Sequence, residues 1–109
     1  MLIAEIPFGV TDWNAIPVTE HRGTTGVAHW RTQLAGTIRM RMVEYSAGYS
    51  ADHWCEKGHV VLCLEGDLVT SLADGRVFRL TPGMSYHVGD GSAPHRSSSR
   101  SGARLFIVD

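Results

Sequence analysis

The sequence contains no segment with the spacing of an amphipathic helix, and this feature most limits how the chain can fold. No window of a dozen residues places apolar side chains at i, i+3, i+4 and i+7 behind a capping residue. Short alternating or apolar runs interrupted by glycine recur instead, a pattern typical of an all-β sandwich or barrel. A chain of 109 residues has the length of one domain. We therefore expect a single all-β domain over residues 1–109.

The strands are expected to be short and to become distinct after Gly26. About eight or nine of them favour a small closed or sandwich-like barrel. Residues 1–24 are interpreted as an irregular wrapping segment, in which Leu2, Ile3 and Ile6 are candidates for an edge strand. The clearest expected strands are 27–34, 37–45, 50–56, 59–70, 76–80, 84–88 and 104–108.

Three side chains of metal-binding type lie within seven positions of one another, at His53, Cys55 and His59. In the expected strand 50–56, a spacing of two places His53 and Cys55 on the same face. Glu56-Lys57-Gly58 has the composition of a turn, and a hairpin there would bring His59 back beside them. The alternative interpretation is three unrelated residues: a surface histidine, a buried thiol and a turn histidine.

Composition excludes several classes of function. A net charge of −1 gives no electrostatic basis for binding nucleic acid or an anionic membrane surface. No run of about 20 apolar residues is present, so no membrane span is expected, and no secretory signal is visible. Two cysteines cannot form a disulfide framework, which fits a reducing cytoplasm.

Two stretches of the sequence resemble the two motifs of the cupin family. The first motif reads Gly-x5-His-x-His-x3,4-Glu-x6-Gly, and residues 48–66 match its spacing apart from a gap one residue short after Gly48. Cys55 and His59 occupy the places of its second histidine and its glutamate. The second motif corresponds to residues 83–99, with His95 at the histidine and Ser99 at the asparagine.

This resemblance implies a cupin-type double-stranded β-helix, that is, a jelly-roll barrel, holding a metal through His53, Cys55, His59 and His95. Within the family, the order Asp52-His53-Trp54-Cys55 is similar to small single-domain cupins named for a DHCW motif, by composition rather than by letter order. Imidazole and thiolate ligands suit a divalent transition metal, with zinc first and nickel or iron as alternatives. An oxidisable thiolate and a missing carboxylate argue against an iron oxygenase.

Four further residues are candidates for the pocket around the metal. Arg39 and Arg41 share one face of strand 37–45 and would bind a carboxylate if that face lines the barrel mouth. A solvated outer face is the commoner arrangement for such a pair. Tyr86 is a candidate proton donor or core aromatic residue. His87 is either a base near the metal or an exposed strand residue, and we favour the exposed position.

Two classes of function remain open, because cupins host many activities. One is a small metalloenzyme acting on a small polar molecule, with the metal polarising an oxygen atom. The other is a noncatalytic metal- or small-ligand-binding protein with a structural or sensory role. We also expect a homodimer, because strands 60–64 and 105–108 are apolar on both faces. Residues 1–24 are the alternative cover for those outer faces.

Overall fold

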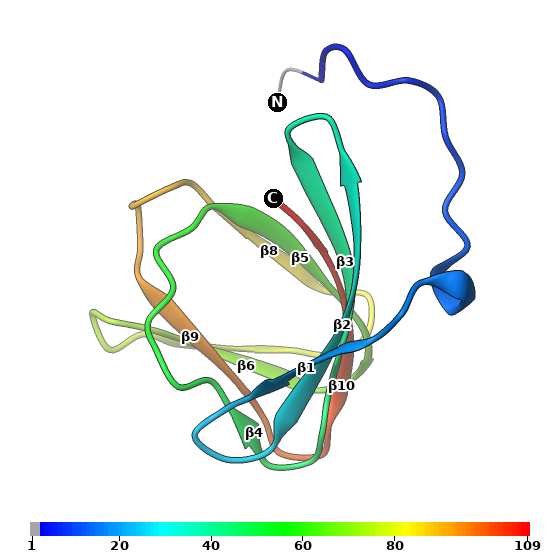
Figure 1. Cartoon of the computed structure of the whole chain (residues 1–109). Coiled ribbons are helices and arrows are strands. Elements are labelled where there is room, and N and C mark those ends of the chain that lie inside the picture. Colours follow the sequence, from blue (N-terminus) through cyan, green and yellow to red (C-terminus); the bar gives the residue numbers. More distant parts are fainter. Residues whose placement is uncertain (1–2) are drawn as a thin grey trace.

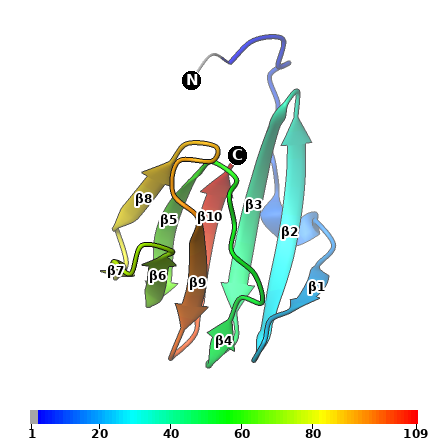
Figure 2. The same cartoon turned by 90° about the vertical axis from the view of Figure 1, so that its left-hand side faces the viewer.

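The computed structural model describes residues 3–109, and these residues form two antiparallel sheets packed face to face (Figures 1 and 2). The larger sheet has the order β1-β2-β3-β10-β5-β8 and the smaller has the order β4-β9-β6-β7. The strands of the larger sheet are β1 (Thr19–Arg22), β2 (Val27–Ala35), β3 (Ile38–Tyr45), β5 (His59–Gly66), β8 (Ser85–Val88) and β10 (Ala103–Val108). Those of the smaller sheet are β4 (Tyr49–Ser50), β6 (Leu68–Leu72), β7 (Val77–Leu80) and β9 (His95–Ser99).

Side chains of alternating positions fill the space between the sheets. On β10, Leu105 and Ile107 point inward, and they lie opposite Val43 and Arg41 of β3 in the antiparallel register. Alternation places Phe106 on the outer face. The buried apolar core is made of Ala28, Val43, Val61, Cys63, Leu68, Leu80, Ala103, Leu105 and Ile107. The all-β expectation is confirmed.

The expected strand 59–70 is divided into β5 and β6 at Gly66-Asp67. Gly66 adopts a φ of 76°, and a Cβ atom there would overlap the carbonyl oxygen of Gly102. Glycine is therefore required where the chain leaves one sheet and enters the other.

The expected strand 50–56 is wrong, because strand pairing ends after Ser50. Residues 51–58 form a loop with a single bridge at Cys55. The alternation that would have placed His53 and Cys55 on one face does not apply there.

The N-terminal segment is more regular than expected. It contains a 3-10 helix, η1 (Trp13–Ala15), and β1, which pairs with β2. Ile3 and Ile6 belong to no strand, and Leu2 lies outside the described residues. Trp13 packs edge-on against Phe106 with ring centroids 6.0 Å apart, so this segment covers part of the outer face of the larger sheet. Among residues 3–109, no helix combines the length and apolar character needed to cross a membrane.

Candidate metal centre

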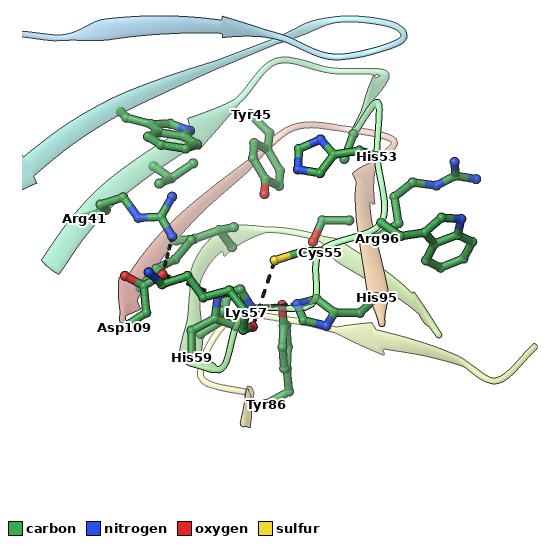
Figure 3. A pocket seen from close by; sticks show the side chains of 18 of the residues that line it. Arg41, Tyr45, His53, Cys55, Lys57, His59, Tyr86, His95, Arg96 and Asp109 are labelled. Carbon is green, nitrogen blue, oxygen red and sulfur yellow. Dashed lines mark hydrogen bonds and ion pairs between the residues drawn. The ribbon is translucent and has the colours of Figure 1, made fainter. Parts of the chain in front are cut away.

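A cavity of about 360 Å³ lies between the two sheets, at the end where β5 begins (Figure 3). Strands β3, β5, β9 and β10 and the loop 51–58 supply side chains to its wall. Cys55, His59, Tyr86 and His95 gather on one side of it, and Arg41 and Asp109 lie on another.

Hydrogen bonds join the loop 51–58 to the start of β9 and to the loop that precedes it. The Cys55 N–H donates to the His95 carbonyl at 2.7 Å, and the His95 N–H donates to the Cys55 carbonyl at 3.0 Å. The Gly58 N–H donates to the Asp90 carboxylate at 2.6 Å, and the Gly91 N–H donates to the Glu56 carbonyl at 2.8 Å. These bonds hold the Cys55 side chain beside His95 although the loop is not a strand.

Cys55, His59 and His95 form a compact group of potential metal ligands. One donor atom from each lies within 4.8 Å of the other two. The Nε2 atoms of His59 and His95 are 2.8 Å apart, and the Tyr86 hydroxyl lies 3.1 Å from His59 Nε2. His95 is 2% exposed and the His59 side chain is 8% exposed. Two imidazoles and one thiolate form a donor set that suits zinc and other divalent transition metals.

The hydrogen bonding of the two imidazoles fits a metal at their Nε2 atoms. His95 Nδ1 lies 2.8 Å from the Ala93 carbonyl, which only accepts, so Nδ1 carries a proton and Nε2 is the nitrogen that can offer a lone pair to a metal. His59 Nδ1 is buried without a hydrogen-bond partner and lies 3.7 Å from the Asp109 carboxylate. If His59 also uses Nε2 as a ligand, its proton is on Nδ1 and faces that carboxylate.

Burial also sets the protonation states in this part of the cavity. Burial, and after it the neighbouring His95, lowers the pKa of His59 to about 4, so this imidazole is neutral at pH 7. Burial raises the pKa of Tyr86 to about 12, so its hydroxyl keeps its proton. Burial disfavours the charge of Asp109, but Arg39 and Arg41 outweigh it and lower the pKa of the carboxyl group.

Solved structures with the same architecture identify the fold. A polyketide cyclase from Streptomyces resistomycificus is 20% identical with a TM-score of 0.77, covering 94% of this chain and 78% of that chain. Ectoine synthase from P. lautus is 21% identical with a TM-score of 0.75, and the match covers 93% of this chain and 76% of that chain. A sugar phosphate isomerase of a cupin superfamily, from Silicibacter pomeroyi, is 16% identical with a TM-score of 0.72. The match covers 92% of this chain and 74% of that chain.

The chain has the cupin fold. No protein-family model matches its sequence, and no curated protein matches it either. The three neighbours carry different activities, as expected for a fold that supports several chemistries. The expected cupin fold is confirmed, whereas the finer assignment to the DHCW group stays a prediction.

His53 lies outside the compact group formed by the other three predicted ligands. Its imidazole is 75% exposed and its Nδ1 atom lies 2.6 Å from the Asp52 carboxylate. His53 also lines the cavity, but it lies in the loop 51–58, so it and Cys55 do not share a strand face. The compact group therefore contains three of the four predicted ligands, and ligation by His53 stays a prediction.

The face of β3 that carries Arg39 and Arg41 lines the cavity, contrary to the commoner arrangement on a solvated surface. Both side chains are paired with Asp109, which sequence reasoning missed. Arg39 Nε and Arg41 Nη2 lie 2.8 and 2.9 Å from its carboxylate oxygens. Asp109 continues the inward alternation of Leu105 and Ile107, and this signal was available in the sequence.

Strand β8 presents Tyr86 inward and His87 outward. Tyr86 is half-buried beside His59, with ring centroids 5.7 Å apart, whereas His87 is exposed, as favoured from the sequence. Cys63 is fully buried in the core between the sheets, and both it and Cys55 are free thiols.

Proposed function

We propose that this cupin binds one divalent transition metal through Cys55 Sγ, His59 Nε2 and His95 Nε2. Zinc is the first candidate, with nickel and iron as alternatives. The observation that carries the proposal is the convergence of one donor atom from each of the three residues within 4.8 Å, with the two Nε2 atoms 2.8 Å apart. The buried Nδ1 atom of His59, which faces Asp109 without a hydrogen-bond partner, supports it, because ligation through Nε2 puts a proton on that atom.

A site with three protein ligands on a cavity favours a catalytic centre over a closed structural one. Catalytic zinc sites have three protein ligands and keep one position open, and the bound metal polarises a ligand oxygen. The protonated Tyr86 hydroxyl, next to His59, is placed to donate a hydrogen bond to a molecule in the cavity. We infer that the protein is a cytoplasmic metalloenzyme that acts on a small polar molecule.

A noncatalytic metal- or small-ligand-binding protein is the second candidate. The carboxylates that line the cavity within the described chain are those of Glu56, which is exposed, and Asp109, which is held by two arginines. Neither carboxylate is placed as a free general base, because a base must reach the proton that it removes. This arrangement favours a sensory or structural role over proton abstraction.

Elemental analysis of protein purified without an affinity tag tests the metal site. Near-stoichiometric metal is expected in the wild type and is expected to be lost in Cys55→Ser and His95→Ala. His53→Ala and Cys63→Ala are matched controls, since they remove the same side-chain types outside the group, and both should retain the metal. A wild-type protein without metal, or full retention in Cys55→Ser, contradicts the proposal.

A further inference from the structure

Two guanidinium groups share one carboxylate in the cavity wall. Arg39 makes two hydrogen bonds to Asp109, at 2.8 and 3.0 Å, and Arg41 makes one, at 2.9 Å. The Asp109 side chain is 1% exposed and that of Arg41 is 6% exposed. The Arg39 side chain is 31% exposed and partly solvated, so the buried part of the cluster is Arg41 with Asp109. Two guanidinium groups share one side-chain carboxylate there, and a buried charge that is not fully balanced is costly unless an anion complements it.

Arg41 has hydrogen-bonding capacity that the described residues do not fill. A guanidinium carries five N–H donors, and among residues 3–109 Arg41 donates only through Nη2, to Asp109. Its Nε atom is buried without a partner. The group lies over the Trp30 ring, with its central carbon 4.4 Å from the ring centroid, a favourable cation–π contact.

The charged side chains that line the cavity also include more basic than acidic groups. Its basic lining residues are Arg39, Arg41, Lys57 and Arg96, and its acidic ones are Glu56 and Asp109. A divalent metal with one thiolate ligand would add a further net positive charge. A concave site lined by an excess of one charge concentrates ligands of the opposite charge.

We propose that the small molecule bound in this cavity carries a carboxylate, which pairs with Arg41 while another part of the molecule faces the metal. This inference rests on the proposed function and adds the substrate class. A carboxylate matches the planar fork of a guanidinium, and a single negative charge balances the excess of the Arg39–Arg41–Asp109 cluster. A cavity of about 360 Å³ limits the ligand to a small molecule.

Calorimetric titration of the zinc-loaded protein with malonate tests the inference, with neutral malonamide and inorganic phosphate as comparison probes. Malonate is expected to bind at least about ten-fold more tightly than either. Arg41→Gln should weaken malonate binding about ten- to a hundred-fold, the loss typical of a hydrogen bond to a charged group. Arg22→Gln removes the same charge at a site that is 86% exposed outside the cavity, and should change binding less than about two-fold.

Zinc content, measured on the same samples, separates this inference from the metal proposal. Unchanged malonate binding in zinc-retaining Arg41→Gln overturns the carboxylate assignment and leaves the metal site standing. Tighter binding of phosphate, or equal binding of malonamide, also overturns it. If the wild type holds no zinc, the metal proposal fails, and Arg41-dependent malonate binding to that protein still supports the carboxylate site. Arg41→Lys, which keeps the charge but loses the fork, replaces Arg41→Gln if the latter does not fold, and unchanged binding there overturns the assignment.

Discussion

Cys55 and His95, forty positions apart in the sequence, exchange both of their backbone hydrogen bonds, at 2.7 and 3.0 Å. This bridge joins the two cupin-like motifs and brings a thiol and an imidazole to the same side of the cavity. The bridge uses backbone atoms alone. Substitution of the Cys55 side chain should therefore remove a ligand without opening the loop.

Zinc should raise the thermal stability of the wild type but not of Cys55→Ser. A ligand that binds only the folded state stabilises it by about 2.7 kcal/mol when its concentration is 100 times the dissociation constant. Without metal, the two proteins should unfold within about 1 kcal/mol of each other. Calorimetric unfolding with zinc and with a chelator measures both effects, and an equal zinc-induced shift in Cys55→Ser would exclude the thiolate as a ligand.

Replacing Asp109 by asparagine should weaken metal binding and destabilise the fold. The substitution removes the carboxylate that faces His59 Nδ1, and loss of such a partner typically reduces metal affinity ten- to a hundred-fold. It also leaves two arginines without their counter-charge, for an expected cost of about 3 kcal/mol. Metal titration and urea unfolding measure the two effects.

Asp74→Asn is the matched control for Asp109→Asn. Asp74 pairs with Arg76 at 2.9 Å, but its side chain is 53% exposed. An exposed pair contributes less than about 1 kcal/mol, so the control should change neither metal affinity nor stability appreciably. Equal effects of the two substitutions would argue that Asp109 has no special role at His59.

The metal-free protein should lose stability as the pH falls from 6.5 toward 4. The pKa of His59 is lowered to about 4 in the fold, so between these values the unfolded chain binds a proton that the folded protein does not. A difference of one pKa unit corresponds to about 1.4 kcal/mol, so at pH 5 we expect a loss of about 2 kcal/mol. Urea unfolding at pH 7 and pH 5 measures the loss. It should shrink in His59→Asn and persist in His87→Ala, and an unchanged loss in His59→Asn would exclude His59 as its source.

We expect a homodimer formed through the outer face of the larger sheet. Trp13 covers Phe106, but Val60 remains 42% exposed on that face. Light scattering should give twice the chain mass of 11.9 kDa, and Val60→Glu should shift the protein toward the monomer. A monomeric wild type at micromolar concentration would contradict this prediction and leave the N-terminal segment as the cover.

The sequence predicted most strands, because alternation interrupted by glycine is a local signal. It also predicted Cys55, His59 and His95, which converge in the structure, because the spacing of the two motifs indicates them. The expected strand 50–56 was wrong, because strand pairing ends after Ser50, so alternation does not place His53 beside Cys55. It missed the pairing of Asp109 with Arg41, because this contact depends on the antiparallel register of β3 and β10. No local pattern specifies which strands become neighbours.

Anomalous diffraction at the zinc absorption edge, from crystals of tag-free protein, would locate the metal directly. We expect one strong peak about 2.3 Å from Cys55 Sγ and about 2.0–2.1 Å from the Nε2 atoms of His59 and His95. No peak at this position in zinc-loaded crystals, or a peak coordinated by His53 in place of Cys55, would contradict this expectation.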